Sequence, residues 1–181
     1  MEENIAEHFE KVAQSYWEFR NPEEKGQWGW MAGILDGEGS IGIIIARTKR
    51  GYFDSQLKVQ VGMTHQKTIQ RLKEISHVGF IRQVRKRKSH HKIQYRWICG
   101  GEKAAAVLRL CLPWLITKKD QALLALAFSD IQELEKKGRA GGRLVGGRRT
   151  GSKPLSAISI SRRKALAEAL HILNKRGTDG S

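Results

Sequence analysis

Two carboxylates, Asp36 and Glu38, lie at the end of an apolar segment that is predicted to be helical, residues 28–36. The C-terminal end of a helix carries partial negative charge, so an unaccompanied anion is disfavoured there. Something positive is therefore expected against these acids. Two sources fit: basic side chains of the chain itself, or a bound divalent cation, which prefers hard oxygen ligands. The second source would bring metal-assisted hydrolytic chemistry to the chain.

Three glycines recur at four-residue spacing along the same segment, at Gly29, Gly33 and Gly37. This spacing places them on one helix face, where small residues let another backbone approach closely. Tight packing within one chain and a helix pair across a two-fold axis both account for the pattern. The helix pair has a chemical consequence, because it would join two copies of the acidic helix end into a paired-carboxylate site. Divalent ions held between carboxylates and phosphates are a route to phosphodiester hydrolysis.

The composition indicates a polyanionic partner. The 181 residues include 33 Lys and Arg against 18 Asp and Glu, a formal net charge of +15, with 40% hydrophobic residues. This suits one domain with appendages that binds nucleic acid. A membrane-surface protein would concentrate its basic residues on one amphipathic helix, whereas here they are spread over predicted strands and loops, so we expect no membrane partner.

Targeting and cysteine content narrow the class further. The N-terminus is acidic where a signal peptide would be basic, and no stretch reaches the length of a spanning helix. We therefore expect an intracellular protein, in cytoplasm, nucleoid or an organelle, that is not secreted. Cys99 and Cys111 lie in apolar contexts and are predicted to be buried thiols rather than a disulfide framework or a zinc cluster.

Hydrophobic periodicity predicts the elements of the first half. Apolar residues at helical spacing predict an amphipathic helix over residues 3–20, followed by a polar break at 21–27. The run 40–46 predicts a strand, and a turn within 47–54 leads to its return strand. In that return strand one face is apolar, with Leu57, Val59, Val61 and Met63.

The second half repeats the order. Thr64 is the expected N-cap of a helix that ends near Ser76. A second hairpin is predicted from strands 78–88 and 93–99, with its turn near 89–91. A helix after Gly100 should end near Pro113, and a long helix that opens with a Thr117-x-x-Asp120 capping box should reach Lys137. A Gly/Arg-rich loop at 138–154 is expected to contact phosphates, and a last helix is predicted at 161–174.

These elements predict an α+β fold in which four antiparallel strands form one sheet with helices on one face and a polar, basic surface on the other. We expect three parts: an N-terminal helical extension over residues 1–24, a core over 25–137, and the Gly/Arg-rich loop with the C-terminal helix over 138–181.

The residues at 31–39, MAGILDGEG, resemble the signature of the LAGLIDADG homing endonucleases, and as in that family a strand beginning Gly-Ser-Ile follows. The resemblance extends over about residues 28–137, through segments 65–68, 78–81, 113–115 and 118–122 in the same order. It implies an αββαββα fold with a saddle-shaped sheet. One motif in a chain of this length implies the single-motif type, which acts as a homodimer.

The resemblance also implies roles for individual residues. The last acid of the motif and the carbonyl before it bind the catalytic metal, Mg²⁺ or Mn²⁺, which assigns Glu38 and Gly37. This position is most often Asp in the family, and Glu is one methylene longer. Asp36 matches the acid that helps to cap the helix pair, whose interface includes Gly29 and Gly33.

Two further catalytic positions follow from the same resemblance. Lys118 matches the active-site lysine that stabilises charge or activates water, in preference to Lys119. For the polar residue that orients water, two alignments compete: counting from the motif selects His65, and residue identity selects Gln66.

Basic and amide side chains on the predicted hairpins are candidates for DNA contact. Arg and Gln read guanine and adenine edges in the major groove, which a two-stranded ribbon can enter, whereas lysines more often contact the backbone. The commonest alternative explanation for alternating polar residues in a strand is a sheet face that is simply exposed to solvent. The candidates are Arg47, Lys49, Arg50, Gln56, Lys58, Gln60, Arg82, Arg85, Lys86, Arg87, Gln94 and Arg96.

Together these observations predict a homodimeric, metal-dependent endonuclease of the homing type that cuts both strands of a long, near-palindromic DNA site and needs no small-molecule cofactor. The first alternative is an RNA maturase or a DNA-binding regulator on the same scaffold without nuclease activity. A second is a basic ribosome-associated protein of unrelated fold.

Overall fold

The computed structural model describes residues 5–17, 21–47, 53–84, 92–139, 144–145, 148–149 and 155–176. A single four-stranded antiparallel sheet organises these residues, with strand order β1-β2-β4-β3. The strands are β1 (Gly39–Arg47), β2 (Phe53–Met63), β3 (Phe80–Val84) and β4 (Gln94–Gly100). A separate short ribbon pairs β5 (Leu144–Val145) with β6 (Arg148–Arg149).

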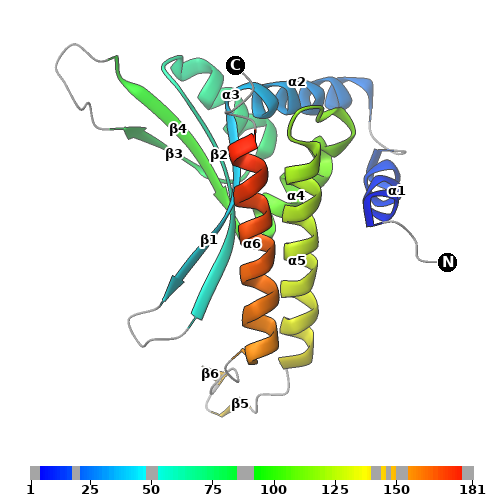
Figure 1. The fold of residues 1–181 in the computed structure, drawn as a ribbon. Helices are drawn as coiled ribbons and strands as arrows, with labels where there is room; N and C mark the ends of the chain where they lie inside the picture. The colour runs from blue at the N-terminus through cyan, green and yellow to red at the C-terminus, as the bar shows by residue number, and fades with distance from the viewer. Residues whose placement is uncertain are drawn as a thin grey trace.

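The helices are α1 (Ile5–Trp17), α2 (Pro22–Glu38), α3 (Gln66–Ser76), α4 (Gly101–Cys111), α5 (Lys119–Arg139) and α6 (Ala157–Arg176), with a 3-10 turn, η1 (Leu112–Trp114). Figure 1 shows α5 and α6 side by side along the sheet, with α2 across one end of the molecule and the two hairpins projecting beyond the helices. The predicted α+β class, with one antiparallel sheet and helices on one face, is confirmed.

Strand alternation sets the packed face of the sheet. Leu57, Val59 and Val61 of β2 are fully buried, and their ladder partners Trp97 and Cys99 of β4 lie on the same face. Directly opposed residues of an antiparallel pair share a face, so this register fixes which side chains the helices cover. The predicted apolar face of β2 is therefore the core, and both cysteines are buried as expected.

The predicted polar break at residues 21–27 is wrong, because helix α2 already begins at Pro22. The Asn21 side chain accepts a hydrogen bond from the Glu24 amide at 2.8 Å, and Pro22 follows at the first helical position. Asn as N-cap with Pro next is a strong helix start. The motif helix is thus 17 residues long rather than the predicted short helix at 28–36.

Two other helix starts differ from expectation. Helix α3 begins at Gln66 with His65, not Thr64, as its N-cap residue. Helix α6 begins at Ala157 rather than near residue 161, because the Ser156 hydroxyl accepts from the Ser159 amide at 3.1 Å. Both segments are helices as predicted, and the difference lies mainly in where their first turns begin.

The flanking helices are joined to the core. Phe9 and Trp17 of α1 are buried, and the Trp17 ring meets Trp114 of η1 edge-on with centroids 4.5 Å apart. In α6, the buried Arg163 donates to Glu135 of α5 at 2.9 Å and to Ser55 of β2 at 3.0 Å. The N-terminal and C-terminal helices therefore pack on the same core as the sheet.

Candidate active site

Asp36 lies near the end of α2 and is held by the segment that leads into α5. Its carboxylate accepts hydrogen bonds from the backbone amides of Ile116 at 2.7 Å and Lys118 at 3.0 Å, and from the Thr117 hydroxyl at 3.1 Å. Asp36 thus satisfies amides at the start of α5 from a position about 80 residues earlier in the chain. The predicted Thr117-x-x-Asp120 capping box is wrong in this respect, because the Thr117 hydroxyl donates to Asp36.

Lys118 completes this contact from the other side. Its ammonium group donates to the backbone carbonyl of Asp36, one of the last carbonyls of α2. A cation on these carbonyls offsets the partial negative charge of the helix end. The structure therefore brings Lys118 to the acidic end of α2.

Glu38 is the last residue of α2 and is exposed. No basic residue lies in the last turn of the helix, and within the part of the chain that the structure describes no ion pair or hydrogen bond engages the Glu38 carboxylate. An anion at a helix C-terminus without a compensating partner is in an unfavourable field. Glu38 is therefore the acid of this pair that is open to an external cation.

Gly39 explains how Glu38 comes to lie against the sheet. Strand β1 begins at Gly39, directly after α2, and Gly39 pairs with Val61 of β2. A Cβ atom at residue 39 would lie 2.4 Å from the carbonyl oxygen of Leu35. Only glycine permits this immediate change from helix to strand, which leaves no linker between the acidic helix end and the sheet.

Both candidates for the water-orienting residue lie at the same end of the sheet. Strand β2 pairs with the start of β1 and ends at Met63, and His65 and Gln66 follow it at the start of α3. Both side chains are exposed. His65 is already engaged, with its Nδ1 atom 2.7 Å from the Thr68 hydroxyl, so the two candidates differ in how freely they can meet a ligand.

The glycines of α2 differ in what surrounds them. A Cβ atom at Gly29 would lie 3.5 Å from the Trp114 side chain of the same chain, whereas at Gly26, Gly33 and Gly37 it would meet nothing within 4 Å. Of the two explanations for the glycine spacing, packing within one chain therefore applies at Gly29, and Gly33 and Gly37 remain available to a second helix. Trp30 is 39% exposed, and its spacing places it with Gly26, Gly33 and Gly37 on one stripe.

The face of the sheet opposite the helices carries most of the predicted DNA contacts that the structure describes. The register places Gln60 opposite Ile98, and Arg96 directly between Gly62 and Arg82. By the same ladders the outward side chains include Gln56, Lys58, Gln60, Arg82, Gln94 and Arg96. Two arginines facing each other across adjacent strands repel, which favours an anionic ligand over this surface.

The remaining predicted DNA contacts are placed differently. Arg47 pairs with Phe53 and has the ladder parity of Ile41, which is buried under the helices, so Arg47 belongs to the helix-covered face at the exposed end of β1. Lys49, Arg50, Arg85, Lys86 and Arg87 lie outside the described residues. The predicted Gly/Arg-rich loop at 138–154 also lies largely outside them.

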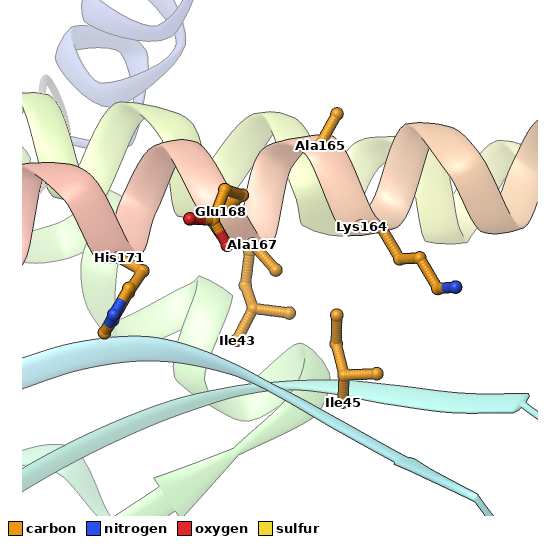
Figure 2. A pocket seen from close by; sticks show the side chains of 7 residues that line it. All are labelled: Ile43, Ile45, Lys164, Ala165, Ala167, Glu168 and His171. Atoms are coloured by element: carbon orange, nitrogen blue, oxygen red, sulfur yellow. The ribbon is translucent and has the colours of Figure 1, made fainter.

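A hollow elsewhere on the molecule contains none of the predicted catalytic residues. Figure 2 shows it between α6 and β1, with Ile43 and Ile45 of the strand facing Lys164, Glu168 and His171 of the helix. It lies on the helix-covered side of β1. Within the described residues, no cluster of three His, Cys, Asp or Glu side chains forms a ready metal site in one chain, and no helix is long and apolar enough to cross a lipid bilayer.

Comparison with known proteins gives a fold. No protein-family model and no curated protein sequence matches the chain. Among solved structures, the homing endonuclease I-CvuI in complex with a DNA target is 18% identical, with a TM-score of 0.63 over 84% of this chain and 85% of that one. The archaeal intron-encoded homing endonuclease I-Vdi141I, complexed with DNA, is 16% identical, with a TM-score of 0.62 over 83% and 85%. The chain has a homing-endonuclease fold.

A third similar structure has a longer chain. I-SmaMI bound to uncleaved DNA with calcium ions is 16% identical, with a TM-score of 0.57 over 78% of this chain but only 44% of its own. The homing-endonuclease fold of the present chain therefore corresponds to less than half of I-SmaMI and to most of I-CvuI. A basic protein of unrelated fold is excluded by these comparisons.

Some features of the site could not be read from the sequence. Trp114 against Gly29, and the capping of α5 by Asp36, join residues about 80 positions apart and leave no local pattern. The start of α2 did leave one, since Asn-Pro before a helix is a recognised cap signal. The outward apolar residues Phe80 and Ile98 were also missed, because the parity of the second hairpin was ambiguous.

Proposed function

We propose that this protein is a homodimeric, divalent-metal-dependent endonuclease of the homing type, which hydrolyses one phosphodiester on each strand of a long, near-palindromic DNA site. The observation that carries this proposal is the end of α2. There Asp36 is engaged by its own chain, Lys118 donates to the Asp36 carbonyl, and the Glu38 carboxylate remains open directly before the start of β1.

The donor set fits a hard divalent cation. The Glu38 carboxylate and the Gly37 carbonyl are oxygen ligands of the kind that Mg²⁺ and Mn²⁺ prefer, and both residues are exposed. When bound, such an ion supplies a Lewis acid for the scissile phosphate and lowers the pKa of a bound water. Glu38 would hold the ion, Lys118 would offset negative charge at the helix end, and His65 or Gln66 would orient water from the start of α3.

The glycines of α2 support the dimer. In a helix interior each glycine costs about 1 kcal/mol relative to alanine. Contact with Trp114 accounts for Gly29, but none of the described residues lies within 4 Å of a Cβ atom at Gly26, Gly33 or Gly37, so none of them requires the bare backbone there. Close approach of a second α2 would account for all three and would bury Trp30. It would also bring two open Glu38 carboxylates together, whereas one chain supplies only one.

The outward face of the sheet supports DNA as the substrate. It presents guanidinium and amide groups, the side chains that read guanine and adenine in the major groove, on strands that can enter that groove. The net charge of +15 supplies the salt-dependent attraction to phosphates. Both I-CvuI and I-Vdi141I were solved with DNA bound.

Break mapping tests this proposal. A randomised plasmid library is incubated with the purified protein in Mg²⁺, in Mn²⁺ or in EDTA, and the DNA ends are sequenced. Discrete breaks on both strands at one related sequence, present with either metal and absent in EDTA, are the expected result. A Glu38→Gln protein purified in parallel identifies breaks from a contaminating nuclease.

Absence of breaks in every arm contradicts the nuclease. If the same preparation still forms a dimer and selects duplex DNA, the outcome assigns a DNA-binding regulator on this scaffold. Selective binding of structured RNA in place of duplex DNA assigns a maturase.

The dimer has its own test. Gly33→Leu adds a bulky side chain where the folded chain leaves space, so the monomer should fold normally while the helix pair is blocked. We expect light scattering to report a dimer for the wild type and a monomer for the variant. Ala106→Leu on the exposed side of α4 is the control and should remain dimeric. A dimer in all three proteins removes α2 from the interface.

A further inference from the structure

Large apolar side chains interrupt the polar surface of the sheet: Ile44 of β1, which is 45% exposed and opposes Gln56, and the neighbouring pair Phe80 and Ile98 of β3 and β4. Phe80 of β3 is 57% exposed and directly opposes Ile98 of β4. Ile98 in turn opposes Gln60 of β2. Opposed residues share a face, so Phe80 and Ile98 lie side by side on the outward surface, away from the helix-covered core that buries Trp97 and Cys99.

The apolar pair has a restricted setting. In the next row of the sheet lie Arg82 and Arg96, and along its own row lies Gln60. Isolated apolar residues on a surface need no explanation, and patches that bind proteins span several hundred Å². Two neighbouring side chains enclosed by guanidinium and amide groups are too small for such a patch. The guanidinium and amide groups around them are instead the kind of side chain that contacts base edges in DNA.

The chemistry that completes this set is the thymine methyl group. In the major groove, arginine pairs with guanine and glutamine with adenine, whereas thymine offers a C5-methyl that apolar side chains contact. We infer that Phe80 and Ile98 form an apolar subsite that reads thymine C5-methyl groups in the DNA target. This inference rests on the proposed function, since it concerns the DNA that the outward face would bind.

The experiment removes only the methyl group. A preferred duplex is first selected from a random library by the wild-type protein, and each thymine in it is then replaced singly by deoxyuridine. We expect binding to weaken about fourfold at one or two neighbouring thymines in each half-site, the worth of one buried methyl-sized group. For Phe80→Ala, the same replacements should change the affinity by less than about 1.5-fold, because a methyl without its partner adds little.

Matched variants separate recognition from general weakening. Lys58→Ala, also on the outward face, should bind all duplexes more weakly and keep the full deoxyuridine penalty. Phe80→Leu keeps an apolar side chain and should restore part of the penalty. Because Phe80 is largely exposed, thermal unfolding of its variants should match the wild type.

The outcomes distinguish the two proposals. A deoxyuridine penalty that is unchanged in Phe80→Ala, or no sensitive thymine in the wild type, overturns the apolar subsite and leaves the endonuclease standing. Failure to select any duplex contradicts the proposed function itself, and the subsite falls with it.

Discussion

Asp36 and Glu38 are two residues apart on the same helix end, yet their surroundings differ completely. The Asp36 carboxylate accepts three hydrogen bonds from the segment before α5, whereas no described residue engages the Glu38 carboxylate. The field of the helix is unfavourable for both acids. The fold therefore compensates one charge internally and leaves the other exposed, which agrees with a structural role for Asp36 and with the metal-binding role that we propose for Glu38.

The sharpest test of this difference is Glu38→Gln. Loss of a metal ligand removes several kcal/mol of charge stabilisation, so we expect cleavage to slow by about a thousandfold or more. Stability should stay the same or rise by up to about 1 kcal/mol, because the substitution removes a negative charge from a helix C-terminus. Cleavage kinetics and urea unfolding measure the two effects. A Glu38→Gln protein that still cuts at the wild-type rate would remove Glu38 from the mechanism.

Lys118→Met tests the cation that donates to the Asp36 carbonyl at the end of α2. We expect cleavage to fall by about a hundredfold while DNA affinity changes by less than about threefold, since one charge acts on the reacting phosphate rather than on binding as a whole. Single-turnover cleavage and binding titrations in Ca²⁺ separate the two quantities. Lys119→Met is the matched control and should cut normally. Equal losses of cleavage in both variants would show that Lys118 acts only through the overall positive charge and has no specific role at the reacting phosphate.

Asp36→Ala should differ from Glu38→Gln in its effect on stability. It leaves three donors without their carboxylate, and we expect the free energy of unfolding to fall by about 2 to 3 kcal/mol. Cleavage should fall as well, because Lys118 and the start of α5 lose their anchor. Urea unfolding at neutral pH gives the value. Stability equal to the wild type would show that water replaces the carboxylate at no cost.

The reactivity of the buried Cys111 thiol offers a second measurement of the difference between Asp36 and Glu38. Burial, and then the charge of Asp36, raise the pKa of its thiol far above the ordinary range, so the native protein should resist thiol reagents. In a Cys99→Ser background, Asp36→Ala should speed labelling of Cys111 by about 10- to 30-fold through more frequent opening of the adjoining segment. Glu38→Gln should leave the labelling rate unchanged. Equal acceleration by both variants would contradict the separation.

Raised thiol pKa values also have a consequence for stability against pH. A thiol that stays protonated in the folded state but ionises when unfolded contributes stability below its unfolded pKa. That contribution is lost as the pH rises toward the folded pKa. Cys99 and Cys111 both act in this direction, so alkaline conditions weaken the core.

The sequence predicted the parts of the molecule whose cause is local. Alternation in β2 identified the buried face, with Leu57, Val59 and Val61, because a strand places every second residue on one side. The sequence also predicted a strand soon after the acidic helix end, and Glu38 does lie at the junction of α2 and β1. Register predicted from apolar positions also placed Gln56, Lys58 and Gln60 on the open face.

Contacts between distant segments could not be predicted in this way. The position of Gly29 under Trp114, and of Asp36 against Ile116, depends on how η1 packs on α2. Arg47 lies on the helix-covered face because its ladder parity follows Ile41, although its charge had placed it with the DNA contacts. The charge of a residue does not show which face of the sheet it occupies, whereas its strand-pairing register does.

The direct passage from α2 into β1 at Gly39 has a consequence for target length. Because no linker separates the two elements, the strands that we propose to read the DNA groove would turn as one rigid unit with α2 of the same subunit. In a symmetric pair, the separation between the two halves of a recognised sequence would then be fixed by how the two motif helices cross. Spacer length would be a property of the subunit contact, while base identity would belong to the strands.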